Sequence, residues 1–234
     1  MRLLRTAATA VFAFALAGCP APATQPPATT PGQPAPDPAA AAALADEVQR
    51  ATVPAGPRQV AFAWELDEAG ARFRGRGVGR YVAPERFRLD LFGPRGETYL
   101  SAALVDGTVR APAILLERFK LPSPALLWGA IGVVRPPADA RLVDATRAGD
   151  EATLRYAAGG DAFEYRLEGG RLRTLRRRAG GGVAESIDLT YDVRGVLQRA
   201  GYRDWAAYRS LNLTLESSQD VAPFPESIWT PPGT

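Results

Sequence analysis

The chain has 234 residues, with 28 basic and 25 acidic side chains and a formal net charge of +3. It contains no histidine and a single cysteine, which excludes His-based acid–base catalysis, Ser-His-Asp triads, imidazole metal sites and intrachain disulfides. A charge this close to neutral gives no electrostatic case for binding nucleic acid.

The sequence also has no phosphate-binding loop, calcium loop or nucleophile-elbow pattern. We therefore predict a protein that is not an enzyme and that needs no catalytic residues, metal or cofactor. A hydrolase built on two positioned carboxylates stays open as an alternative, because such an enzyme needs only Asp or Glu side chains.

The first residues have the features of a secretory signal peptide. Arg2 and Arg5 precede a short apolar stretch, which is well below the ~20 residues that a membrane-spanning helix needs. The run that closes this stretch, Leu-Ala-Gly-Cys ending at Cys19, resembles the lipobox of bacterial lipoproteins. That resemblance implies cleavage after residue 18 and acylation of Cys19, for example with palmitate. An ordinary signal peptide that leaves Cys19 as a free thiol is the alternative.

Residues 19–38 form the next segment, which consists almost entirely of Pro, Ala, Thr, Gln and Gly. A segment without large apolar side chains cannot form a core, and its prolines favour extended polyproline II structure. We therefore expect a tether between the lipid anchor and a folded domain. Pro20 follows Cys19 where lipoproteins retained in the inner membrane are expected to carry aspartate, so an outer-membrane location facing the periplasm is predicted.

A helix is predicted over residues 37–50. Asp37 and Pro38 suit the start of a helix, and the alanine run that follows has high helix propensity. Leu44 and Val48 lie four residues apart and therefore share one face.

Beyond residue 57 the apolar pattern changes to a period of two, which is typical of strands with one buried face. The positions that share a face within each run are Val60, Phe62, Trp64 and Leu66; Phe87, Leu89 and Leu91; Phe163, Tyr165 and Leu167; Val183, Glu185, Ile187, Leu189 and Tyr191; and Leu211, Leu213 and Leu215. Short glycine-containing turns separate these runs, and one more helix is predicted from about Ser123-Pro124. The sequence therefore predicts one mainly β (α+β) domain over residues 39–234, a curled antiparallel sheet that forms an incomplete barrel with a few covering helices.

The predicted strand from residue 72 to 82 has three glycines, Gly75, Gly77 and Gly79, on one face. Glycine inside a strand marks sharp curvature or the close approach of other groups. We interpret the three glycines as a sign of a strongly coiled sheet with space inside it. The opposite face carries Arg72, Arg74, Arg76 and Arg80, which we expect to face solvent.

Two local motifs resemble the LolB-like branch of the LolA/LolB superfamily of periplasmic lipoprotein carriers and receptors. Residues 91–96, Leu-Phe-Gly-Pro-Arg-Gly, resemble its strand-ending turn, and residues 121–129, with Leu-Pro followed by Leu-Leu-Trp-Gly, resemble its inserted helix. The resemblance covers most of residues 40–230. It implies an incomplete β-barrel with a helical lid that binds acyl chains without covalent chemistry.

The resemblance also implies which residues bind the acyl chain and which face the membrane. Its acyl-chain cavity would be lined here by apolar side chains of the sheet and the lid, namely Phe62, Trp64, Phe87, Leu89, Leu91, Leu126, Leu127 and Trp128. Its membrane-facing turn would be Gly93, Pro94, Arg95 and Gly96. In the family pattern the residue at the position of Arg95 is an apolar leucine. An arginine contacts lipid headgroups but is costly to place in hydrocarbon.

We therefore predict a lipid-anchored monomer that binds lipid or lipoprotein acyl chains and takes part in lipoprotein localisation. The alternative is an envelope scaffold that binds a protein partner or surface polymer through an arginine-rich face. Arg72, Arg74, Arg76 and Arg80, or the run Arg176-Arg177-Arg178, would then make the contacts.

Overall fold

A computed structural model describes residues 37–118 and 121–233. The predicted signal peptide, Cys19 and nearly all of the predicted tether lie outside the described residues. No helix in the described ranges is both long enough and apolar enough to span a bilayer.

The domain is built on one antiparallel sheet of twelve strands, which confirms the predicted fold class. The order of the strands is β5-β4-β3-β2-β1-β12-β11-β10-β9-β8-β7-β6, so β1 pairs with β12 in the middle, and β5 and β6 form the two edges of an open sheet. The strands are β1 Arg58–Glu68, β2 Ala71–Val82, β3 Arg86–Phe92, β4 Thr98–Val105, β5 Thr108–Arg110, β6 Arg141–Ala148, β7 Glu151–Ala158, β8 Asp161–Glu168, β9 Arg171–Ala179, β10 Gly182–Tyr191, β11 Leu197–Asp204 and β12 Arg209–Asp220. Tight turns join most of them in sequence, as expected for a meander.

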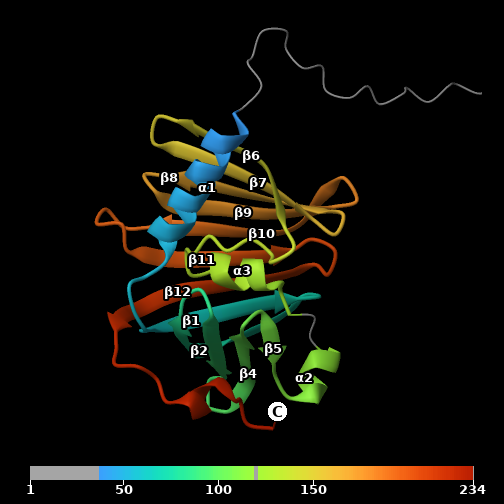
Figure 1. Ribbon diagram of the computed structural model, residues 1–234. Helices are drawn as coiled ribbons and strands as arrows, with labels where there is room; N and C mark the ends of the chain where they lie inside the picture. Colours follow the sequence, from blue (N-terminus) through green and yellow to red (C-terminus); the bar gives the residue numbers. More distant parts are fainter. Residues whose placement is uncertain (1–36, 119–120, 234) are drawn as a thin grey trace, which may run out of the picture. The chain divides into compact units, whose positions relative to one another are not determined.

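The sheet is strongly coiled, so that β2 to β5 run steeply to the direction of β6 to β11 (Figure 1). The glycines of β2 contribute to this coil. A Cβ atom on Gly75 would overlap the carbonyl oxygen of Phe92 in β3, and one on Gly77 would overlap the ring of Phe62 in β1. The space that the sequence predicted beside these glycines is thus filled by neighbouring side chains and backbone, because the missing Cβ atoms let those groups approach.

Within the described residues, three α-helices pack on or beside the sheet: α1 Pro38–Thr52, α2 Ala113–Arg118 and α3 Pro124–Gly129. Both predicted helices, α1 and α3, are present. The Asp37 carboxylate accepts a hydrogen bond from the Ala39 amide (2.9 Å) and caps α1, and Ala41, Ala45 and Val48 form its buried face. We refer to the side of the sheet that α1 and α3 cover as the inner face.

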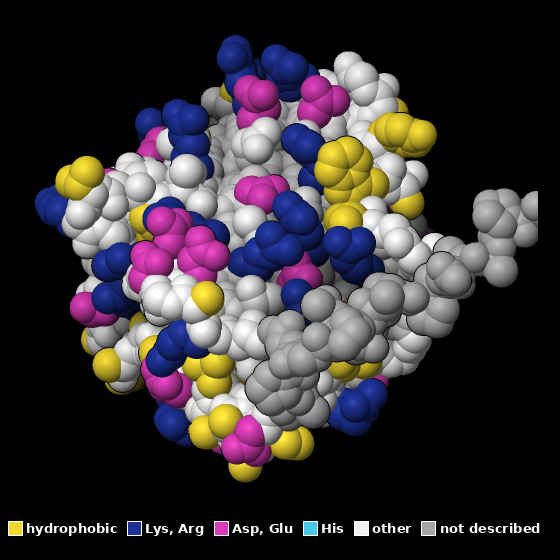
Figure 2. Space-filling view, turned by 90° about the horizontal axis from the view of Figure 1, so that it is seen from above, with side chains coloured by type: hydrophobic (Ala, Val, Ile, Leu, Met, Phe, Trp, Pro, Cys, Tyr) yellow, Lys and Arg dark blue, Asp and Glu magenta, His cyan; other side chains and the backbone are white. Residues whose placement is uncertain are grey.

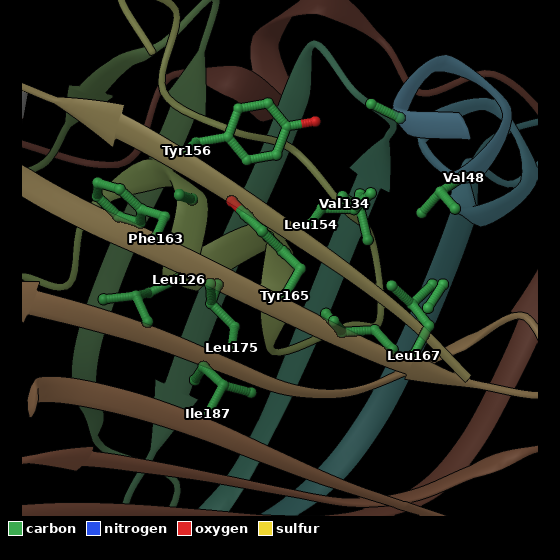
Figure 3. Close-up of a cluster of buried hydrophobic side chains, with 14 of the residues drawn as sticks. Val48, Leu126, Val134, Leu154, Tyr156, Phe163, Tyr165, Leu167, Leu175 and Ile187 are labelled. Atoms are coloured by element: carbon green, nitrogen blue, oxygen red, sulfur yellow. The ribbon is translucent and has the colours of Figure 1, made fainter. Parts of the chain in front are cut away.

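The core on the inner face has two parts. In the first, the buried side chains of α1 pack with strands β6 to β11, and Leu126 of α3 lies near Leu175 and Ile187 (Figure 3). In the second, α3 and the segment that follows it pack on β1 to β4, and the ring of Trp128 lies 5.8 Å from that of Phe87. Because α3 belongs to both parts, it closes the middle of the inner face.

The C-terminal segment covers the outer face of β3 and β4. It contains the 3-10 helix η1 Glu226–Trp229, and Trp229, which is 2% exposed, packs on Ala103 and Val105. Beside it, Asp90 is buried and binds two guanidinium groups, those of Arg80 and Arg88, at 2.9 Å each. Arg88 also donates to the carbonyl of Ile228 at 2.6 Å, which ties the C-terminal segment to the sheet.

Candidate functional site

Two adjoining apolar hollows lie between the inner face and α3. Their volumes are about 60 Å³ and about 100 Å³. Leu89, Leu127 and Leu211 line both, so only side chains separate one hollow from the other. We call the two hollows together the apolar trough.

Strands from both halves of the sheet form the walls of the trough, and the chain from Pro122 to Ile131 forms its cover. The lining side chains are Val60, Phe62, Leu66, Phe87, Leu89, Leu91, Tyr99, Leu100, Leu121, Pro122, Leu126, Leu127, Ala130, Ile131, Ile187, Ala200, Tyr202, Arg209, Leu211, Leu213 and Leu215. Nearly all are aliphatic or aromatic, and a cavity of this kind stays dry when it is empty.

The polar ends of two lining residues are engaged outside the trough. The Tyr202 hydroxyl donates to the buried carboxylate of Glu185, and burial raises the pKa of Tyr202, so that this hydroxyl keeps its proton. Arg209 donates from Nε to the Glu68 carboxylate at 2.7 Å. These interactions leave the hydrophobic effect as the main force that a ligand in the trough would experience.

The trough is closed in this structure. Pockets for drug-sized ligands typically measure roughly 300–1,000 Å³, and each hollow is several times smaller. A complete acyl chain therefore fits only if α3 moves away from the sheet. This helix is six residues long, and its N-cap residue, Ser123, makes no side-chain capping bond.

Most of the residues predicted to line an acyl-chain cavity border the trough. Phe62, Phe87, Leu89, Leu126 and Leu127 border the first hollow, and Leu89, Leu91 and Leu127 border the second. Their binding of an acyl chain stays a prediction.

The two predicted tryptophans border neither hollow. The Trp64 indole N–H lies within hydrogen-bond distance of the carbonyls of Arg76 (3.0 Å) and Phe92 (3.1 Å), to which it donates. Trp128 faces the core and is 2% exposed. Both side chains therefore pack within the walls of the trough and do not line its open space.

Sequence reasoning missed the contribution of β12 to the trough. The sequence predicts that one face of this strand carries Leu211, Leu213 and Leu215, but it does not predict that the strand pairs with β1. Register pairs such as Trp64 with Leu213 and Leu66 with Leu211 bring these leucines beside β1. This pairing joins residues far apart in the chain, so alternation within one strand carries no signal for it.

The turn predicted to face a membrane joins β3 and β4. Pro94, Arg95 and Gly96 are exposed, and the Arg95 amide donates to the Glu97 carboxylate at 2.9 Å. Since neighbouring strands are antiparallel, the β11–β12 turn lies at the same end of the sheet. That turn exposes Trp205 and Tyr208, two aromatic residues of the type enriched at membrane interfaces.

A third hollow, of about 290 Å³, lies toward the opposite end of the sheet. It shares Val60, Ile131 and Leu215 with the first hollow of the trough, but it also has polar and cationic lining residues, including Arg58 and Arg171. We call it the Arg58–Arg171 hollow.

The arginine-rich outer face is largely neutralised by acidic neighbours. Arg72 pairs with Glu65 and Asp67, and Arg76 pairs with Glu216. On the face seen in Figure 2, acidic side chains likewise lie among the basic ones. Such a surface provides no continuous positive field for an anionic polymer.

Arg177, from the middle of the run Arg176-Arg177-Arg178, points to the inner face and binds two carboxylates. It donates to Asp161 and to Glu185 at 2.6 Å each. Both carboxylates are therefore engaged by one guanidinium. Within the described ranges, no group of three or more acidic or cysteine side chains is arranged to hold a metal ion.

Comparisons with known proteins support the fold assignment. No protein-family model matches the chain, and no curated protein does. Among solved structures, the LolA superfamily protein NE2245 from Nitrosomonas europaea is similar, with a TM-score of 0.54 and 13% identity over 81% of this chain and 97% of that one. A putative outer membrane lipoprotein-sorting protein domain from Vibrio parahaemolyticus gives a TM-score of 0.51 and 9% identity over 82% and 96%. The domain therefore has a LolA/LolB-like fold.

Proposed function

We propose that this protein, which has the LolA/LolB-like fold, is a non-catalytic envelope lipoprotein that binds an acyl chain of a lipid or lipoprotein in the apolar trough. The observation that carries the proposal is the pair of adjoining apolar hollows under α3, a short helix that can be displaced without breaking a strand pairing. Apolar lining from both halves of the sheet supports a long, thin and apolar ligand rather than a polar one.

The energetics of burial also support such a ligand. Each methylene group that moves from water into the trough contributes about 0.8 kcal/mol, so ten of them contribute about 8 kcal/mol. This gain must offset the contacts that α3 loses when it moves. Because these contacts are mainly non-directional apolar ones, α3 can regain part of them against the bound chain.

The proposed location is the periplasmic side of the outer membrane, with the monomeric domain tethered through acylated Cys19. The lipobox-like run before Cys19 and Pro20 after it support this location. The exposed β3–β4 and β11–β12 turns offer arginine, tryptophan and tyrosine side chains for contact with headgroups. Lipoprotein localisation is the process that such a binding protein would serve.

Replacement of Leu127 by arginine tests the proposed ligand site. Leu127 borders both hollows, so the variant places a guanidinium in the middle of the trough, and burying a charge without a partner is costly. We expect the affinity for 1-dodecanol, a neutral single-chain probe, to fall at least about tenfold relative to the unmodified domain. Isothermal titration calorimetry below the solubility limit of the probe measures this change.

The matched control is Ile114→Arg. Ile114 lies in α2, is 63% exposed and borders neither hollow, so this variant adds the same charge to the surface. Its dodecanol affinity should equal that of the unmodified domain. Equal binding by Leu127→Arg, with both variants folded by circular dichroism, would exclude the trough as the ligand site.

A further inference from the structure

We infer that the Arg58–Arg171 hollow holds the anionic headgroup of an amphiphile whose hydrocarbon chain lies in the apolar trough. The inference rests on the proposed function, because it assigns the polar end of the ligand that the trough would bind. It names the ligand class: a single- or multiple-chain amphiphile with a phosphate or carboxylate headgroup.

The first argument is continuity. The hollow shares wall residues from β1, β12 and the segment after α3 with the trough, so the two are neighbours along the same strands. The trough and the hollow together form a row of adjoining spaces. At the end of this row that lies near the β3–β4 turn, the lining consists largely of leucines. The other end adds hydroxyls and guanidinium groups, including Tyr81, Ser218 and the two arginines. The row therefore changes from apolar to polar along its length, as an amphiphile does.

The second argument is charge. The lining of the Arg58–Arg171 hollow contains two arginines and no Asp or Glu. Asp220 engages Arg58 at Nε (2.8 Å), but its own side chain is 77% exposed and it does not line the hollow. Among the described residues, Arg171 forms no ion pair with a carboxylate. An arginine without a carboxylate beside it is suited to bind a phosphate or carboxylate through charge-assisted hydrogen bonds.

The third argument is the placement of Arg171. Its guanidinium lies against Gly195 in the β10–β11 turn, where any Cβ atom would overlap it. The turn that follows β8, with Gly170, lines the same hollow. Both glycines have positive φ, +78° and +75°, which glycine adopts at little steric cost. Small residues at the rim thus leave room for Arg171 beside the opening.

Binding of matched probes by calorimetry tests the inference. The probes are dodecyl phosphate, 1-dodecanol with the same chain and no charge, and inorganic phosphate with the charge and no chain. We expect the unmodified domain to bind dodecyl phosphate at least about tenfold more tightly than dodecanol, as one or two charge-assisted hydrogen bonds would give. We expect inorganic phosphate alone to bind far more weakly than dodecyl phosphate.

Arg171→Gln and Arg58→Gln assign the preference to the hollow. Each should bring the two dodecyl affinities to within about threefold of each other, mainly by weakening dodecyl phosphate. Arg178→Gln removes an exposed arginine from the outer side of β9 and serves as the charge-matched control, which should keep the full preference.

The outcomes separate this inference from the proposed function. Binding of neither dodecyl probe contradicts both. Equal binding of the two dodecyl probes, or a preference for phosphate that Arg171→Gln and Arg58→Gln leave intact, contradicts only the headgroup site. Inorganic phosphate that binds as tightly as dodecyl phosphate would mean a free-anion site and would also overturn the inference.

Discussion

Replacement of Gly75 by alanine is expected to destabilise the domain by about 3 kcal/mol or more. A Cβ atom at this position would overlap the carbonyl oxygen of Phe92, which is backbone, and would touch the Trp64 ring at 3.0 Å. That carbonyl also accepts a hydrogen bond from the Trp64 indole, so it cannot shift without loss of the bond. Overpacking typically costs about 1–3 kcal/mol and occasionally more, and overlap with a backbone atom that cannot move aside places Gly75→Ala at or above the upper end of this range.

Urea denaturation of the two proteins measures the change in the free energy of unfolding. The control is Gly182→Ala in β10, where a Cβ atom would meet nothing within 4 Å. Because alanine restricts the unfolded chain more than glycine does, the control should be neutral or slightly stabilising. If Gly75→Ala were as stable as the control, β2 and β3 would not approach each other as closely as described here.

The second large effect is expected for Asp90→Ala, which should cost about 3–5 kcal/mol of stability. Asp90 is 5% exposed and is bound by Arg80, Arg88 and the Ser101 hydroxyl. Its removal leaves the guanidinium groups of Arg80 and Arg88 beside each other without their shared carboxylate. The cost comes mainly from these uncompensated charges rather than from one lost ion pair.

Glu216→Ala is the matched comparison, since it removes a carboxylate that pairs with an arginine at the solvent-exposed surface. Arg76 and Glu216 are 81% and 39% exposed and lie 3.4 Å apart, so this change should cost less than about 1 kcal/mol. Thermal unfolding of both variants gives the difference. Similar losses for the two variants would show that the Asp90 cluster is as well solvated as the surface pair.

The packing of the C-terminal segment on the outer face also explains why the alternation of apolar residues does not predict strand β4. Strand β4 reads as a nearly continuous apolar run, because Leu100, Ala102 and Leu104 face the core while Ala103 and Val105 face Trp229. A strand buried on both faces has no polar positions to alternate with. By contrast, β1, β3 and β8 have one clearly apolar face each, and the sequence predicts them correctly.

Helix α2 was not predicted for a different reason. It spans only six residues, and of its large apolar side chains Leu115 packs against the core while Ile114 and Leu116 are exposed, so no amphipathic pattern marks it. The longer α1 has a cap, a proline in its first turn and a buried stripe, and each of these can be read from the sequence.

The residues of the candidate site also differ in whether a local sequence pattern reveals them. The apolar positions of β1, β3 and α3 that border the trough could be identified because each belongs to a local pattern or motif. The leucines of β12 and the arginines of the Arg58–Arg171 hollow could not, since the pairing of β1 with β12 and the meeting of distant turns bring them into place. Non-local strand pairing of this kind leaves no periodicity in the sequence.

Native mass spectrometry of the protein purified from its own envelope in mild detergent tests the central claim most directly. We expect a protein mass that includes an acylated Cys19, together with a non-covalent lipid adduct that dissociates on activation. The Leu127→Arg variant, purified in the same way, should retain the covalent acyl mass and lose the adduct. An unmodified protein that carries no lipid adduct, or an adduct that Leu127→Arg retains in full, would contradict acyl-chain binding in the trough.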